Sequence, residues 1–105
     1  MANIAKSDPR LAKAVKGEPK GGLDFEIGSG TAQEADQLGK IWVGDGYRIS
    51  SDGKALISAD RQRSYRPASY KPNTPSKFNP TGVQANFIKQ TSAGKVISNG
   101  HMVIK

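Results

Sequence analysis

The chain has 105 residues, a formal net charge of +7, one histidine and no cysteine. A chain of this length holds one small domain with a single modest core. The lack of cysteine excludes disulfides, thiolate zinc sites and a thiol nucleophile. We find neither a long apolar run nor a signal-peptide pattern, so we expect no stable membrane insertion and no secretion signal within this stretch.

The first predicted helix lies near the start of the chain. Asp8 and Pro9 are typical of a helix start, Gly17 is typical of a helix end, and the residues between them have a thin apolar face. The glycine-rich stretch 17–22 is typical of a linker, and the alternating residues 23–27 predict a brief strand.

A second helix is predicted from residue 32 to about residue 40. Thr31 and Glu34 have the spacing of a capping box, in which each side chain satisfies an unpaired backbone amide of the other residue. The apolar stripe of this helix leads into Trp42, which we expect to be the main anchor of the core.

Two hairpins are predicted in the second half of the chain. Residues 47–50 and 54–58 flank a turn with Asp52-Gly53, and residues 82–90 and 95–105 flank the connection 91–94. Helical signals precede most strand signals, which favours an α+β fold with one or two N-terminal helices packed on a small twisted antiparallel sheet of about four or five strands. We expect residues 1–27 to form an N-terminal helix and linker segment, and residues 28–105 to form the main part of a single compact domain.

The second hairpin sorts its side chains onto two faces. Pairing Gln90 with Lys95 sets Gln84 opposite His101 and Asn86 opposite Asn99. The predicted core face carries Val83, Ala85, Phe87, Val96, Met102 and Ile104. The other face carries Gln84, Asn86, Asn99 and His101, and we expect it to be exposed. A row of amides beside the only histidine is typical of a small acid-base site on a rigid platform.

Residues 61–80 are predicted to form a basic loop between the hairpins. This stretch has five basic residues, three aromatic residues, four prolines and no acidic residue, which is too polar and too broken by proline for a core element. Lys and Arg supply phosphate partners and the aromatic rings supply stacking faces, the two requirements of single-strand recognition. A solvated surface loop is the alternative.

The positive charge is concentrated in the second half of the chain. Residues 1–45 hold six Lys or Arg and seven Asp or Glu, whereas residues 46–105 hold ten and two, which gives net charges of −1 and +8. Such asymmetry favours a polyanionic partner, whether nucleic acid, an anionic membrane surface or an acidic protein. A solubilising surface is the alternative that composition leaves open.

Short blocks along residues 28–105 resemble a known family. They are Gly30-Thr31, Glu34-Ala35-Asp36, Leu38-Gly39, Trp42-Val43-Gly44, Leu56-Ile57-Ser58-Ala59-Asp60, Tyr65-Arg66-Pro67, Gly82-Val83-Gln84-Ala85-Asn86-Phe87 and Asn99-Gly100-His101. Together they resemble the C-terminal toxin domains of filamentous haemagglutinin-like effectors of contact-dependent growth inhibition. Several toxins of this kind are ribonucleases, often of tRNA, on the small α+β scaffold shared by barnase, EndoU, the colicin RNases and RelE.

The resemblance implies a biological setting. It implies that residues 28–105 are the nuclease toxin domain, that this domain is the C-terminal part of a secreted, outer-membrane surface effector, and that it acts in the cytoplasm of a neighbouring target cell. A cognate acidic immunity protein would neutralise the toxin in the cell that produces it. A target-cell accessory factor such as a translation elongation factor is a further implied partner. Arg61 stands where similar sequences carry glycine, and Ile88 where an acidic residue often follows, so neither is carried over as a site residue.

The available side chains favour RNA cleavage without a metal or another cofactor. Residues 61–105 contain one His and no Asp or Glu, which disfavours a metal site there. RNA carries its own nucleophile in the 2′-hydroxyl, so a protein need only move protons and stabilise charge on the phosphate. The predicted catalytic residues are His101, Arg66, Lys71 and Tyr65, and the predicted substrate-binding residues are Gln84, Asn86, Arg63, Tyr70 and Lys77.

Two other functions stay open at this point. One is a non-catalytic basic module that binds RNA or an acidic protein. The other is a toxin with a target other than RNA, for instance DNA or a membrane. Serine-hydrolase chemistry has no support, because the chain lacks a nucleophile elbow and His101 has no carboxylate close to it in sequence.

Overall fold

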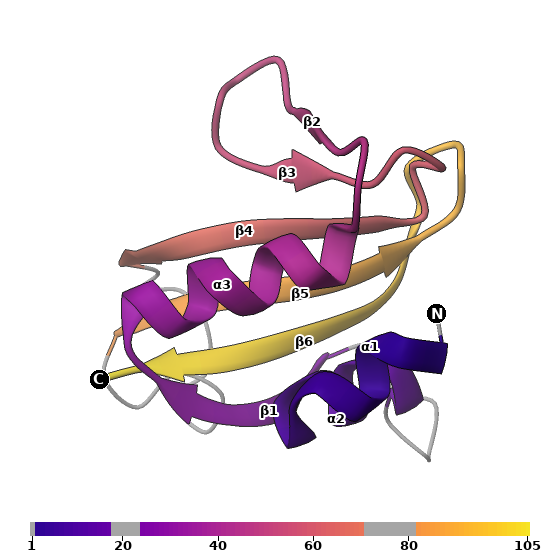
Figure 1. Ribbon diagram of the computed structural model, residues 1–105. Helices are drawn as coiled ribbons and strands as arrows, with labels where there is room; N and C mark the ends of the chain where they lie inside the picture. Colours follow the sequence, from indigo (N-terminus) through magenta and orange to yellow (C-terminus); the bar gives the residue numbers. More distant parts are fainter. Residues whose placement is uncertain (1, 18–23, 71–81) are drawn as a thin grey trace.

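The computed structural model describes residues 2–17, 24–70 and 82–105 and shows an α+β fold, as the sequence predicts (Figure 1). The helices are α1 (Ala2–Ser7), α2 (Pro9–Lys16) and α3 (Ala32–Val43), and the strands are β1 (Asp24–Gly30), β2 (Arg48–Ile49), β3 (Leu56–Ile57), β4 (Arg63–Tyr70), β5 (Val83–Gln90) and β6 (Val96–Ile104). The strands form one six-stranded sheet in the order β1-β6-β5-β4-β3-β2. The sheet is therefore larger than the expected four or five strands, and it is mixed because β1 runs parallel to β6.

The helices cover one face of the sheet. In Figure 1, α3 crosses β4, β5 and β6, whereas α1 and α2 lie over the β1 end on the same side. Apolar side chains from all three helices and from the sheet form one core cluster. The predicted boundary between residues 27 and 28 falls inside β1, so the N-terminal segment shares its core with the rest of the chain. None of the helices among the described residues is long and apolar enough to cross a membrane.

The first predicted helix is present as α2. Its N-cap is Asp8, whose carboxylate accepts a hydrogen bond from the Arg10 amide over 2.8 Å. The Arg10 guanidinium also binds this carboxylate and donates to the Ser29 carbonyl of β1 over 2.9 Å, which ties α2 to the edge of the sheet. The hydrogen bonds from the Arg10 side chain lower the pKa of Asp8 below its ordinary value.

The capping box at the start of α3 is confirmed. Glu34 N donates to the Thr31 hydroxyl over 3.1 Å, and Thr31 N donates to the Glu34 carboxylate over 3.0 Å. The helix continues to Val43 and so includes Trp42, which is completely buried as predicted. The indole Nε1 donates to the carbonyls of Ser64 and Ile88, at 2.9 and 3.3 Å, and so joins α3 to both β4 and β5.

Gly39 is the point where α3 comes closest to the sheet. A Cβ atom at this position would lie 2.4 to 2.5 Å from ring atoms of Tyr65, which is far inside van der Waals contact. We expect Gly39→Ala to destabilise the protein by about 1–3 kcal/mol through overpacking, although alanine is the better helix former by about 1 kcal/mol. Urea unfolding would measure the change, with Gln37→Ala on the exposed side of α3 as the matched control. If the alanine variant were as stable as the wild type, α3 could shift away from β4 at no cost in free energy, and the overpacking prediction would be wrong.

The segment expected to be a basic loop is in its first part a strand of the sheet. Residues 63–70 form β4, which pairs with β5 along its length and with β3 only at Tyr65 and Ser64. Pro67 is tolerated because it lies beyond the β3 contact and at a bulge in the pairing with β5, where a missing amide donor breaks no ladder bond. The prediction of a loop was wrong here because the proline content outweighed the alternation of residues 63–66.

The first predicted hairpin is confirmed as β2 and β3. Gly53 in its turn has a φ of 74°, the left-handed conformation that the Asp-Gly sequence predicts. In the second hairpin, Thr91 N donates to Lys95 O, and Gln90 pairs with Val96. Because Lys89 pairs with Ser98, Ile97 is an extra residue on β6, a β-bulge.

The register of this hairpin differs from the predicted one by two residues: the turn contributes one, because Gln90 pairs with Val96 and not with Lys95, and the bulge contributes the other. His101 is opposite Asn86, not opposite Gln84, and Asn99 is opposite Ile88. A shift of two residues keeps every side chain of the later part of β6 on its predicted face. Val96 precedes the bulge, and it is 40% exposed instead of lying in the core.

Candidate active site

A row of four polar side chains crosses the sheet on the face opposite the helices. Glu26 of β1 is the register partner of His101, His101 is the partner of Asn86, and Asn86 is the partner of Arg66 on β4. Register partners on adjacent strands point to the same face, so a carboxylate, an imidazole, an amide and a guanidinium stand in line. The two charged ends of this cross-strand row are exposed, whereas its middle is buried.

His101 is held on both of its ring nitrogens. Nε2 lies 2.9 Å from Asp24 Oδ1, and Nδ1 lies 2.8 Å from Gln84 Oε1 and 3.2 Å from Asn86 Nδ2. A carboxylate only accepts hydrogen bonds, so the contact with Asp24 keeps a proton on Nε2. Nδ1 can accept from the Asn86 amide when the ring is neutral and donate to Gln84 when the ring is charged. The ring therefore has a partner for Nδ1 in either protonation state.

The polar face is more buried than the sequence suggests. His101, Asn86 and Gln84 are only 4%, 3% and 1% exposed, although we expected them on an open surface. Their mutual hydrogen bonds explain how polar groups are accommodated there. Ile88 and Val103 are buried on the same face.

The acidic residues of the site come from β1, a segment for which sequence reasoning assigned no function. Asp24 contacts His101 directly, and Glu26 is its register neighbour. About 75 residues of chain separate them from the histidine, and only the parallel pairing of β1 with β6 brings them together. The alternation of residues 23–27 placed Asp24 and Glu26 on one face of a strand, but nothing local in the sequence indicated which strand would be its neighbour.

A pocket of about 450 Å³ opens beside the row, over β4, β5 and β6. It is lined by Ser64, Arg66, Gln84, Asn86, Ile88, Gln90, Gly94, Val96 and Asn99. The lining contains amides, a hydroxyl and one guanidinium but no carboxylate. Such a surface can accept hydrogen bonds from bases and place a cation against a phosphate.

Two of the predicted site residues lie on the other face of the sheet. Tyr65 is buried against Phe87 beneath α3, and its hydroxyl donates to Asp36 over 2.8 Å. Burial, with this hydrogen bond, raises the pKa of Tyr65, so its hydroxyl keeps its proton. Arg63 donates to the carbonyl of Trp42 at the end of α3 over 2.7 Å. The structure therefore gives Tyr65 and Arg63 contacts in the core and at the helix end, away from His101.

The structure brings together Arg66, Gln84, Asn86 and His101 of the predicted set. Lys71 and Lys77 lie outside the described residues. Tyr70 is the last residue of β4, and its side chain is also outside the part that the structure describes.

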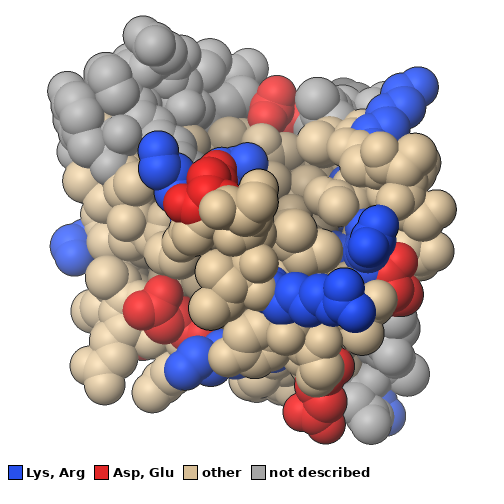
Figure 2. Space-filling model, turned by 90° about the horizontal axis from the view of Figure 1, so that it is seen from above, with Lys and Arg blue, Asp and Glu red and all other residues tan. Residues whose placement is uncertain are grey.

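Charge on the described surface is mixed. Figure 2 shows the end of the molecule at the top of Figure 1, where Lys and Arg side chains stand apart and are interspersed with Asp and Glu. The excess of cations in residues 46–105 therefore does not form one continuous field over the described part of this side.

No protein-family model matches the chain, and no curated protein or solved structure is significantly similar to it.

Proposed function

We propose that the protein is an endoribonuclease that cleaves RNA without a metal ion and acts as an antibacterial toxin domain. The observation that carries this proposal is the cross-strand row from Glu26 through His101 and Asn86 to Arg66. It combines a carboxylate that can take a proton with a guanidinium that can bind a phosphate, as cleavage of RNA through its 2′-hydroxyl requires.

The reach of the side chains agrees with this division of roles. Strands in a sheet are about 4.8 Å apart, so the Cα atoms of Glu26 and Arg66 are separated by three spacings, about 14 Å. Both side chains are long and exposed, and a phosphodiester over Asn86 would lie between them. Asp24, with 45% of its side chain exposed, holds His101 from the side of β1.

In the proposed reaction, the Glu26 carboxylate accepts the proton of the 2′-hydroxyl. The 2′-oxygen then forms a bond to phosphorus while the bond to the 5′-oxygen breaks, and water supplies the proton of the leaving group. Arg66 stabilises the charge that builds up on the phosphate oxygens. The products are a 2′,3′-cyclic phosphate and a free 5′-hydroxyl. His101 is a positioning residue, which holds Asp24 through its Nε2 beside Glu26.

A second candidate function is a basic module that binds RNA without cleaving it. The burial of His101 favours this candidate, because both ring nitrogens are occupied and little of the ring faces solvent. Arg66 and the amides of the pocket would then provide affinity alone.

Incubation of purified protein with total RNA in EDTA separates the two candidates. We expect discrete cleavage, with products that carry 2′,3′-cyclic phosphate ends, and no cleavage when the substrate is fully 2′-O-methylated. Binding of RNA without cleavage would favour the second candidate. Cleavage that stops in EDTA would contradict the metal-independent reaction.

The toxin role, with tRNA as the preferred substrate, is supported by the family resemblance of residues 28–105 and by the net charge of +8 over residues 46–105. A basic toxin of this kind fits an acidic immunity protein that covers it quickly through complementary charge. We expect growth arrest when the protein is induced in bacterial cytoplasm, and relief when a small acidic protein encoded next to it is co-expressed. Normal growth with full expression of a folded, active ribonuclease would contradict the toxin role alone.

A further inference from the structure

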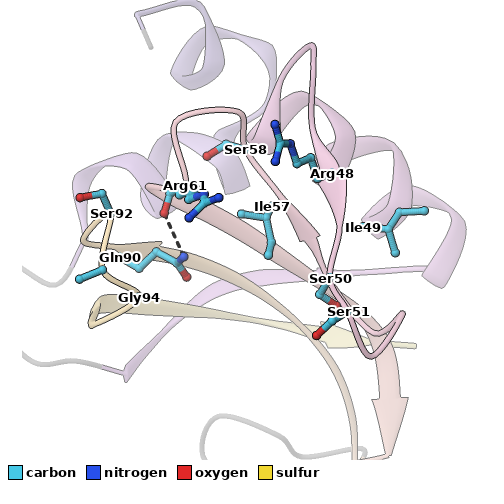
Figure 3. A pocket seen from close by; sticks show the side chains of 11 residues that line it. Arg48, Ile49, Ser50, Ser51, Ile57, Ser58, Arg61, Gln90, Ser92 and Gly94 are labelled. Atoms are coloured by element: carbon cyan, nitrogen blue, oxygen red, sulfur yellow. Dashed lines mark hydrogen bonds between the residues drawn. The ribbon is translucent and has the colours of Figure 1, made fainter.

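A second pocket lies between the β2–β3 hairpin and the turn that joins β5 to β6. Its volume is about 570 Å³ (Figure 3). The lining residues are Arg48, Ile49, Ser50, Ser51, Ile57, Ser58, Arg61, Gln90, Ser92, Ala93 and Gly94. They come from three separate parts of the chain, and none of them is acidic.

Two guanidinium groups point into this pocket. Figure 3 shows Arg48 and Arg61 extending toward each other from opposite sides, with Ile57 between them. No ion pair within residues 2–17, 24–70 and 82–105 engages either group. Two cations that share a pocket without a carboxylate repel each other and favour an anionic occupant.

The backbone of Arg61 has a conformation that is uncommon for an arginine. Its φ is 63°, and it is the only residue other than glycine with a positive φ in the described part of the chain. Two hydrogen bonds keep Arg61 in this conformation, each over 2.9 Å. The Arg61 amide donates to the Ser58 carbonyl, and Gln90 Nε2 donates to the Arg61 carbonyl. Glycine would adopt this conformation without strain, and strained residues of this kind cluster at ligand sites.

The pocket also offers groups for the rest of a nucleotide. Ile57 is the register partner of Arg48 and so lies on the same face, where it provides an apolar side chain against which a base or ribose can pack. The hydroxyls of Ser51 and Ser92 make no hydrogen bond in the part of the protein that the structure describes, and both line the pocket. A phosphate, with its several acceptor oxygens, matches this set of donors.

Gln90 and Gly94 line both this pocket and the pocket beside Arg66, so the two pockets are adjacent. We propose that the Arg48–Arg61 pocket is a phosphate-binding subsite for a single RNA strand whose neighbouring nucleotides occupy the Arg66 pocket. This inference rests on the proposed ribonuclease for the identity of the strand. It adds a determinant of substrate length, because only a strand that spans both pockets reaches Arg66 together with Arg48 and Arg61.

The test compares Arg48→Gln/Arg61→Gln with the charge-matched control Lys13→Gln/Lys40→Gln, whose exposed side chains lie on α2 and α3. The probes are fluorescein-labelled, fully 2′-O-methylated RNAs of about 4 and about 12 nucleotides, within the range of single-strand site sizes. Fluorescence anisotropy measures affinity over a series of salt concentrations, and circular dichroism verifies the fold of each variant.

We expect the arginine variant to bind the long probe about tenfold more weakly and to lose less affinity for the short probe, which can still bind in the Arg66 pocket. The slope of log K against log salt should become less negative by about 1.4, since each phosphate contact on a single strand contributes about 0.7. Equal losses in the arginine variant and the control would overturn the subsite, as would unchanged binding of the long probe. If the double variant does not fold, Arg48→Gln alone carries the test with about half of the slope change.

The outcome is separable from that of the ribonuclease proposal. If the wild type cleaves no RNA but the arginine variant loses affinity as described, the subsite stands and the ribonuclease fails. If the wild type cleaves RNA and the arginine variant binds the long probe normally, the subsite alone fails.

Discussion

Replacing Glu26 by glutamine should slow RNA cleavage by about 10²-fold or more, because a general base contributes at least this much to proton transfer. The substitution keeps the size of the side chain and removes only its negative charge. Glu26 is exposed, so we expect the free energy of unfolding to change by about 0.5 kcal/mol or less. Single-turnover cleavage of a defined RNA, with saturating enzyme, measures the chemical step apart from binding.

Asp45→Asn is the matched control for this variant, because Asp45 is an exposed carboxylate in the connection after α3, away from β1. We expect it to cleave at the wild-type rate. Cleavage at an undiminished rate by Glu26→Gln would remove Glu26 from the mechanism, and Asp24→Asn would then test the other carboxylate beside His101.

His101→Ala would be a selective probe of catalysis only if His101 lay on an open surface, as the sequence predicts. The ring is buried and contacts Asp24, Gln84 and Asn86, so its removal leaves buried polar groups without partners at a cost of about 1–3 kcal/mol. Loss of cleavage in that variant would therefore mix chemistry with folding. Glu26→Gln avoids this ambiguity.

Replacing Trp42 by alanine should lower the free energy of unfolding by about 3–5 kcal/mol, the cost of truncating a large buried aromatic side chain. The indole is completely buried, packs edge-on against Phe87 with ring centroids 6.2 Å apart, and binds the carbonyls of Ser64 and Ile88. Small domains have about 5–15 kcal/mol in total, so the variant should be close to unfolding at ambient temperature. Urea denaturation followed by circular dichroism measures the loss.

Trp42→Phe separates packing from hydrogen bonding at this position. Phenylalanine keeps most of the buried ring but cannot donate to the two carbonyls, so we expect a smaller loss of about 1–3 kcal/mol. A loss below about 1 kcal/mol for the alanine variant, well under the range for a buried tryptophan, would contradict the role of Trp42 as the anchor between α3 and the sheet.

The sequence was most informative where neighbouring residues decide the structure. Asp8 caps α2, Thr31 and Glu34 begin α3, and Gly53 takes the left-handed conformation in its turn, all as their local patterns predict. Each of these signals involves residues at most three positions apart. Each signal determines only a few backbone amides or one φ angle, so distant contacts do not easily override the local preference.

The sequence was less informative where distant residues decide the structure. The bulge at Ile97 changed the register of β6, and the parallel pairing of β1 with β6 supplied the carboxylates beside His101. A bulge has no strict sequence signature, and the neighbour of a strand depends on how the whole chain folds. The candidate site could therefore be predicted as a histidine with amides on one face, but not as a row that begins at Glu26.

The parallel pairing of β1 with β6 also determines when the candidate site can first exist. Glu26 is made about 75 residues before His101, so all the parts of the site are outside the ribosome only after β6 has left the exit tunnel. Pairings between such distant segments form late and slowly in folding. A partner that captures the chain as it emerges would therefore meet it before the row from Glu26 to Arg66 is assembled, and the ribosome making the chain would not be exposed to the proposed ribonuclease during elongation.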